Sequence, residues 1–135
     1  MLSEGTPAYD EFTADYWSAQ QGNVDPYCIF KPSKALQVST AVLLSRLTQC
    51  PFAVKGGGHA AFAGGSSIEG GITIALENMN GITLSSDRKT ASIGSGNRWG
   101  NVYKTLEQYG VQVVGGRVCV LLGPICRIVL LTYRR

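Results

Sequence analysis

A run of glycines near the middle of the chain limits its fold more than any other feature. Residues 55–67 read Lys-Gly-Gly-Gly-His-Ala-Ala-Phe-Ala-Gly-Gly-Ser-Ser, and two more glycines follow at positions 70 and 71. Glycine makes up 17 of the 135 residues, whereas its usual share is ~7%. Consecutive glycines lack the side chains that pack helices and strands, but they let backbone N–H groups converge on an anion. We therefore expect a loop here that carries the function of the chain.

The apolar pattern on either side of this glycine run predicts an α+β fold. A helical spacing precedes the run and is followed by a short apolar strand that leads into the three glycines. Alternating patterns after the run predict strands, of which the second and third form a hairpin around Asp87-Arg88-Lys89. The expected order is helix (32–50), strand (52–55), Gly-rich loop, three strands (72–76, 82–84 and 90–94), helix (97–110) and strand (111–114).

The helix after the hairpin has the clearest amphipathic pattern. Asn97 is suited to cap its start and Gly110 to end it. Its aromatic residues could be imagined as a stacking pair for a cofactor ring, but their helical spacing favours a place in the core. The residues of this apolar face are Trp99, Val102, Tyr103 and Leu106.

Charge and hydropathy argue against two classes of partner. The chain has 12 basic and 9 acidic residues, with a net charge of +3, and no basic cluster precedes the last two residues, so a nucleic-acid surface is not expected. The longest apolar stretch, 118–131, is interrupted by Pro124 and Arg127 and is shorter than the ~20 residues that a bilayer requires. No membrane span and no metal site are predicted. The first residues have no signal-peptide pattern, and the localisation stays open.

The glycine run formally satisfies the loose dinucleotide fingerprint, through Gly56, Gly58 and Ala61, with Glu77 at the ribose-binding distance. We reject this interpretation, because the fingerprint needs a helix that starts within the loop and the later glycines leave no room for one. A flexible surface loop is the alternative. His59 is the only histidine and is preceded by glycines, so a reactive imidazole beside a phosphate-binding loop is favoured over a histidine of the core.

Four motifs carry a resemblance to a known family. They are the segment 50–67, Tyr16-Trp17-Ser18-Ala19-Gln20-Gln21, Asn97-Arg98-Trp99-Gly100-Asn101-Val102-Tyr103 and Val114-Gly115-Gly116-Arg117-Val118. In this order and spacing the chain resembles the FAD-linked oxidases of the vanillyl-alcohol oxidase type, and among them the fungal proteins like berberine bridge enzyme. The resemblance implies the first, α+β subdomain of a PCMH-type FAD-binding domain, in incomplete form.

The resemblance also implies the cofactor and its ligands. The loop Gly56–Ala61 would wrap the pyrophosphate of FAD, and His59 would bond covalently to the 8α-methyl of the isoalloxazine ring. An imidazole is a competent nucleophile for such a bond. No catalytic residue is expected in this chain; in complete relatives a small-molecule substrate gives a hydride to the flavin, which oxygen reoxidises. The expected cofactor-binding residues are Gly56, Gly57, Gly58, His59, Ala60, Ala61, Gly64, Ser66, Gly115 and Gly116.

The expected organisation is an irregular N-terminal arm (1–31) with one helical turn around Phe12 to Gln20, a partial FAD-binding domain (32–117) and a divergent apolar tail (118–135) of low order. The main hypothesis is that the chain is the FAD-binding portion of an oxidoreductase. There are two alternatives: a catalytically inert fragment that binds an anion or a partner, and a gene-model product. Some members of the family have a second flavin bond, from a cysteine, and its position matches Val118 rather than Cys119. Whether Arg117 contacts the cofactor stays open. For Cys28 and Cys50, which flank the first helix, both a disulfide and two reduced thiols stay open.

Overall fold

The strands before and after the glycine run lie side by side in one sheet of the computed structural model, which describes residues 1–116, 128–129 and 131–132. Strand β3 (Phe52–Lys55) pairs in parallel with β4 (Ile72–Ala75), and Phe52 lies opposite Ile72. Strand β2 (Cys28–Phe30) pairs with β4 in parallel on its other side, and β1 (Leu2–Ser3) extends the sheet by an antiparallel pair with β2. The order β1-β2-β4-β3 thus anchors both ends of the glycine run in neighbouring strands.

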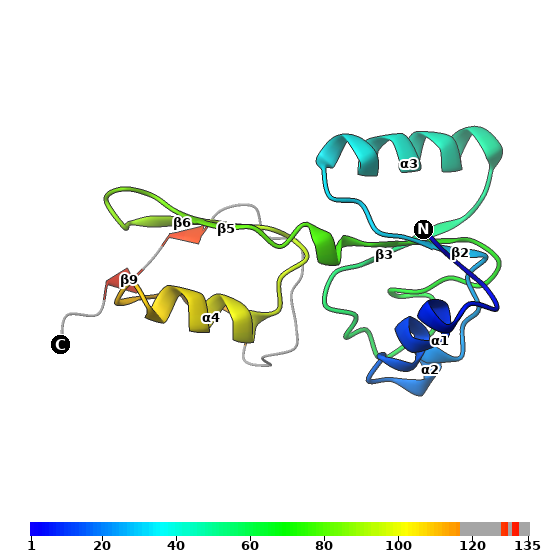
Figure 1. Cartoon of the computed structure of the whole chain (residues 1–135), viewed down its shortest axis with the longest axis horizontal. Coiled ribbons are helices and arrows are strands. Elements are labelled where there is room, and N and C mark those ends of the chain that lie inside the picture. The colour runs from blue at the N-terminus through cyan, green and yellow to red at the C-terminus, as the bar shows by residue number, and fades with distance from the viewer. Residues whose placement is uncertain (117–127, 130, 133–135) are drawn as a thin grey trace.

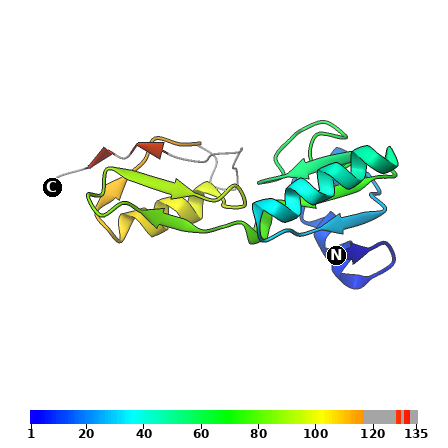
Figure 2. The same cartoon turned by 90° about the horizontal axis from the view of Figure 1, so that it is seen from above.

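Helices cover both faces of this sheet (Figures 1 and 2). Helix α3 (Ala35–Thr48) lies on one face, and α1 (Pro7–Ala14) and α2 (Ala19–Gly22) lie on the other. The residue after Pro32 begins the turn into α3, and Gln49 ends the helix in a left-handed conformation just before Pro51. The core beneath α1 consists of buried Tyr9, Phe12, Tyr16, Ile29 and Ala75.

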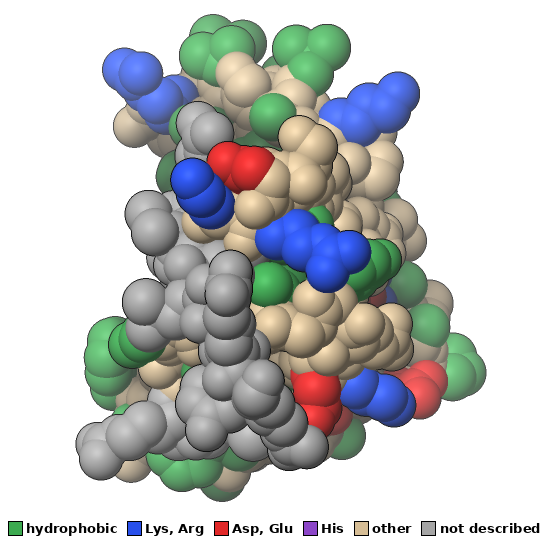
Figure 3. Space-filling view, turned by 90° about the vertical axis from the view of Figure 1, so that its left-hand side faces the viewer, with side chains coloured by type: hydrophobic (Ala, Val, Ile, Leu, Met, Phe, Trp, Pro, Cys, Tyr) green, Lys and Arg blue, Asp and Glu red, His purple; other side chains and the backbone are tan. Residues whose placement is uncertain are grey.

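The outer face of α3 is apolar and exposed. Four of its leucines are more than half exposed, and hydrophobic side chains project from the top of the view in Figure 3, where α3 lies. Between α3 and the sheet a cavity of about 380 Å³ is lined by apolar groups that include Phe30 and Ile72. The exposed leucines are Leu36, Leu43, Leu44 and Leu47.

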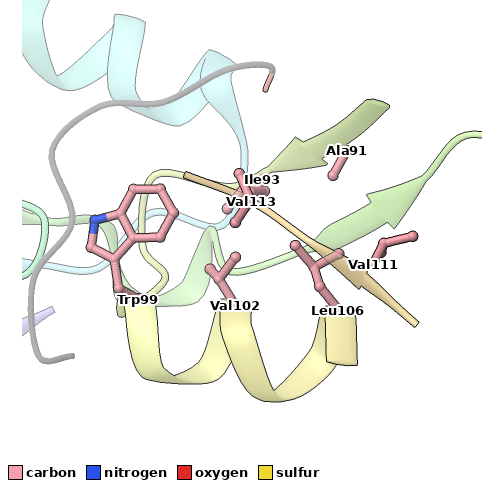
Figure 4. Close-up of a cluster of buried hydrophobic side chains, with 7 residues drawn as sticks. All are labelled: Ala91, Ile93, Trp99, Val102, Leu106, Val111 and Val113. Carbon is pink, nitrogen blue, oxygen red and sulfur yellow. The ribbon is translucent and has the colours of Figure 1, made fainter. Parts of the chain in front are cut away.

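The second lobe follows a single turn of 3-10 helix, η1 (Leu76–Asn78). It consists of the hairpin β5 (Ile82–Leu84) and β6 (Thr90–Ile93), helix α4 (Trp99–Glu107) and strand β7 (Val111–Gln112). The apolar side of α4 packs on the hairpin and on β7 (Figure 4), which confirms the predicted amphipathic helix and its core face. The buried residues of this core are Ala91, Ile93, Trp99, Val102, Leu106, Val111 and Val113.

Two sequence-based expectations about local structure are wrong. Asn97 does not cap α4, because its side-chain amide donates to the carbonyl oxygens of Gly94 and Gly81 at 3.0 and 3.4 Å, and Arg98 takes the cap position. Residues 1–31 are not irregular, because they hold α1, α2, β1 and the central strand β2. Short elements of this kind have too few residues to show a period.

Most of the divergent tail lies outside the described residues. Two strands of the tail are described, β8 (Ile128–Val129), which pairs with β6, and β9 (Leu131–Thr132), which pairs with β7. The expectations for Arg117, Val118 and Cys119 fall outside the described residues. Cys28 and Cys50 are both half-buried free thiols, and burial raises the pKa of Cys28.

The described residues bear on two further kinds of site, a membrane span and a metal site. No helix among them combines the length and the hydropathy that crossing a bilayer needs. Within the same residues, no three His, Cys, Asp or Glu side chains gather in a way that could hold a metal ion.

Candidate functional site

The glycine run folds around a cavity of about 290 Å³. Its walls come from the end of β3, from both arms of the glycine run and from two residues at the junction of the lobes. Leu76 belongs to η1, and Ser95 follows β6 in the second lobe. The lining residues are Val54, Gly56, Gly57, Gly58, His59, Ala60, Gly65, Ser66, Leu76 and Ser95.

Successive amides on the first arm of the loop are free to bind a ligand. Among the hydrogen bonds of the described residues, none uses the backbone N–H of Gly57, Gly58, His59 or Ala60 as a donor. Gly58 has a φ of +72°, and a Cβ at this position would lie 2.6 Å from Cε of Lys55. The loop conformation therefore requires glycine here, and consecutive N–H groups in such a turn favour an anion.

A buried cation lies directly below this arm. Lys55 is 5% exposed, and its Nζ sits 4.1 Å from the ring centroid of Phe12 and 4.6 Å from that of Tyr16. Burial lowers the pKa of Lys55, and the two aromatic faces offset part of the cost of burying the charge. The ammonium adds positive charge beside the loop, as an anionic ligand would favour.

The second arm of the loop is held by the segment from Tyr16 to Gln21. The Tyr16 hydroxyl donates to the carbonyl oxygen of Ser66 at 2.7 Å, and the Ser18 hydroxyl donates to that of Ala61 at 3.2 Å. Gln21 is wholly buried, and its Oε1 accepts from the amides of Ser66 and Ser67 at 3.2 and 3.1 Å. These bonds fix the loop to α2, the short helix that contains Gln21.

His59 is held on one side by an aromatic ring. The indole of Trp17 stacks on the imidazole, with ring centroids 4.3 Å apart and planes at 22°. Trp17 is otherwise exposed, and His59 also lines the cavity. The stacking leaves the nitrogens at the edge of the imidazole free to reach a ligand.

Two unpaired polar atoms test whether the loop fits a polar ligand. Nε2 of Gln21 and Oγ of Ser67 are buried and, within the described structure, have no hydrogen-bond partner. Leaving such a group unpaired costs about 1–3 kcal/mol of stability. Because of this cost, a buried polar atom without a partner calls for an explanation other than packing, such as a role in ligand binding. Gln21 and Ser67 lie outside the cavity lining, so the fit to a phosphate-bearing group rests on the free amides and on the side chain of Lys55 against Gly58.

The structure brings most of the expected site residues together. The cavity is lined by Gly56, Gly57, Gly58, His59, Ala60 and Ser66. Ala61 and Gly64 lie on the exposed part of the same loop. Gly115 and Gly116 do not line this cavity; they lie against the ring of Trp99, and the Tyr103 hydroxyl donates to the carbonyl oxygen of Gly116 at 2.9 Å. Their contact with a cofactor stays a prediction.

Sequence reasoning missed the contribution of the N-terminal segment to this site. The motif from Tyr16 to Gln21 carried the family resemblance, but nothing in its spacing indicated that it contacts a loop more than 40 residues away. Lys55 was seen as the last residue of a strand, and its burial has no local signal. The available hint was the concentration of polar and aromatic residues in one short motif, where five of the six residues from Tyr16 to Gln21 are of these kinds.

Comparison with known proteins agrees with this geometry. The family model described as "FAD binding domain" matches residues 26–123. Over 103 residues the chain is 42% identical to the FAD-dependent monooxygenase tpcD of Cochliobolus heterostrophus, which covers 76% of this chain and 20% of the relative. Over 119 residues it is 39% identical to the FAD-dependent monooxygenase yanF of Aspergillus niger, with 86% of this chain and 20% of the relative covered. The chain thus spans about a fifth of the length of these relatives.

Solved structures share the fold. The 6-hydroxy-D-nicotine oxidase of Arthrobacter nicotinovorans matches with a TM-score of 0.79 and 23% identity, over 89% of this chain and 26% of that protein. The wild-type BBE-like 1 protein of Physcomitrella patens matches with a TM-score of 0.71 and 22% identity, over 85% of this chain and 25% of that protein. These likenesses confirm the predicted α+β architecture of the PCMH-type FAD-binding domain.

Proposed function

Because the chain belongs to the FAD-binding domain family, with FAD as its cofactor, we propose that it supplies the pyrophosphate site and the flavin-linking histidine of an FAD-dependent oxidoreductase. The observation that carries the proposal is the loop 56–67, where free amides and the only histidine line one cavity and the buried side chain of Lys55 lies against Gly58. The fungal relatives are named as monooxygenases, and the resemblance seen in the sequence implies an oxidase. The proposal concerns the oxidoreductase class that the two share.

The pyrophosphate of FAD is assigned to the first arm of the loop. The amides of Gly57 and Gly58 supply donors, and Lys55, whose side chain lies against Gly58 without lining the cavity, adds positive charge nearby. A cavity of about 290 Å³ suits a phosphate-bearing part of the cofactor, since pockets for whole ligands of drug size reach roughly 300–1,000 Å³. At this arm the chain binds the pyrophosphate and thereby orients the cofactor.

His59 is assigned to the covalent bond with the 8α-methyl carbon of the isoalloxazine. Trp17 stacks on the imidazole at 4.3 Å and orients its plane, and His59 lines the cavity. Bound FAD supplies a hydride acceptor for a small-molecule substrate. The residues of this chain hold the cofactor, keep it attached and neutralise its phosphates.

A flavin titration tests the proposal. We expect saturable FAD binding to the purified chain, which is lost when Gly57 and Gly58 are both replaced by valine. Wild-type protein should keep its yellow flavin absorbance in the pellet after denaturing precipitation, whereas the His59→Ala variant should release it. Flavin that still survives precipitation in His59→Ala would contradict the covalent assignment.

An inert anion-binding fragment is the second candidate, and the free amides of the loop favour it as well. The two candidates differ in their response to inorganic pyrophosphate. An inert fragment should bind pyrophosphate and FAD with equal affinity, because only the phosphates would be recognised. An FAD site should bind FAD more tightly, since the flavin adds contacts at His59.

A further inference from the structure

The side-chain amide of Gln21 lies at the end of the glycine loop, and it accepts several hydrogen bonds from this part of the loop. The side chain is wholly buried in α2, and Oε1 accepts three hydrogen bonds, from the Ser66 amide, the Ser66 hydroxyl and the Ser67 amide. Its Nε2 has no partner within the described structure. This one side chain therefore controls both backbone amides at the end of the loop.

A carboxylate at the same position would accept these three bonds equally well. It would also leave no amide donor unpaired, so hydrogen bonding alone favours glutamate over glutamine. The chain nevertheless has the neutral amide. A negative charge here would lie beside Ser66 and Gly65, two residues of the cavity wall, and would repel an anion bound in that cavity.

From these observations we infer that Gln21 is a positioning residue of the FAD site, and that it acts through its acceptor oxygen and its neutrality. The oxygen holds the second arm of the loop in the shape that encloses the cavity. The absence of charge keeps the site compatible with the pyrophosphate. This inference rests on the proposed function, because it takes the ligand of the cavity to be the FAD pyrophosphate.

Two substitutions separate the acceptor from the charge. Gln21→Met keeps the approximate volume and removes the acceptor. Gln21→Glu keeps the acceptor and adds a charge that depends on pH. The same two substitutions at Gln20, the exposed neighbour in α2, serve as matched controls.

Hydrogen exchange of the chain without FAD measures the first role. In Gln21→Met the amides of Ser66 and Ser67 should exchange faster, while those of α4 keep the wild-type rate and show that the fold persists. Gln21→Glu should exchange like wild type. Unchanged exchange at Ser66 and Ser67 in Gln21→Met would overturn the inference. If Gln21→Met fails to fold, faster exchange of these amides in Gln21→Glu than in wild type would overturn it.

FAD titration across pH measures the second role. Both variants should weaken FAD binding roughly tenfold at pH 8, whereas the Gln20 variants should stay within about twofold. Lowering the pH should restore affinity in Gln21→Glu, as its carboxyl is protonated, and should leave Gln21→Met weak. A purely structural role would give no such recovery, and wild-type affinity of Gln21→Glu at all pH values would overturn the inference.

The outcome for wild-type protein distinguishes this inference from the proposed function. If the wild-type chain binds no FAD, the proposed function fails, and with it the role of charge at Gln21. Exchange at Ser66 and Ser67 then decides the loop-holding role alone. If wild type binds FAD and the Gln21 variants bind it equally well, only the inference fails.

Discussion

The indole of Trp17 lies 4.3 Å from the imidazole of His59, ring centroid to ring centroid, with their planes 22° apart. These residues are 42 positions apart in the chain, and they join the segment between α1 and α2 to the glycine loop. Trp17 is 56% exposed to solvent. Its contact with His59 therefore explains why a large aromatic residue stands at this surface position. The stacking orients the residue assigned to the flavin bond.

A nuclear magnetic resonance spectrum tests this stacking directly, because the chain has a single histidine. The ring current of the indole should shift the carbon-bound protons of the His59 ring upfield. Trp17→Leu should move these signals downfield, toward free histidine, while Trp17→Phe should move them only part of the way. Signals that do not respond to Trp17→Leu would contradict the stacked arrangement.

Gly58→Ala should destabilise the chain by about 2–3 kcal/mol. The left-handed backbone costs an alanine roughly 1–2 kcal/mol, and the added methyl would displace Lys55, whose Cε lies 2.6 Å from the Cβ position. Gly64→Ala is the matched control, with a φ of +80° and open space around it. Urea unfolding should show a smaller loss for Gly64→Ala; equal losses would mean that Lys55 does not restrict Gly58.

Tyr16 should make stability fall at high pH. Burial raises the pKa of Tyr16 from 10.0 to about 12, so the unfolded chain loses this proton at lower pH than the folded chain. Folded protein then binds more protons between pH 10 and about 12, and the free energy of unfolding decreases as pH rises through that window. The stabilisation is complete below pH 10.

Tyr16→Phe provides the control for this alkaline effect. It removes the hydroxyl that donates to Ser66 at 2.7 Å, and should cost about 1 kcal/mol at neutral pH. The difference between wild type and variant in urea unfolding should shrink from pH 10 upward. A difference that stays constant across this range would show that Tyr16 titrates in the same way in both states.

Replacing a buried leucine of the second lobe should destabilise the chain much more than replacing an exposed leucine of α3. Leu106 is 1% exposed and packs in that core, whereas Leu47 on α3 is 80% exposed. Leu106→Ala should lower the free energy of unfolding by about 2–5 kcal/mol, and Leu47→Ala should change it by no more than about 0.5 kcal/mol. A large loss for Leu47→Ala in a dilute sample would show that α3 is covered in solution.

Much of this fold could be predicted where residues repeat with a clear period. The helix of Trp99 and Leu106 and the hairpin before it follow from local pattern. The hairpin strands agree with the structure to within one residue, whereas the helix is shorter than predicted at both ends. Strand β2 could not be found in this way, because three residues, Cys28 to Phe30, have no measurable period. Their place in the sheet is decided by pairing with β4, which lies more than 40 residues later.

The residues of the candidate site likewise fall into those that the sequence identifies and those that only the structure shows. Gly58 and His59 were identified because consecutive glycines and a lone histidine are visible in the sequence. Gln21 was not identified, since its importance lies in hydrogen bonds to Ser66 and Ser67 that span 45 and 46 residues. A glutamine carries no local mark of burial, and only the folded chain shows that it is enclosed.

These long separations also determine the order of events when the chain folds. The bonds from Tyr16 and Ser18 to the loop close segments of 50 and 43 residues, and such closure is entropically costly and slow compared with helix formation. Within the described loop, the backbone makes one local hydrogen bond, from the amide of Gly65 to the carbonyl oxygen of Phe62. We therefore expect the loop to acquire its shape after the first lobe has assembled, so that the helices of a newly made chain form before it can bind a cofactor.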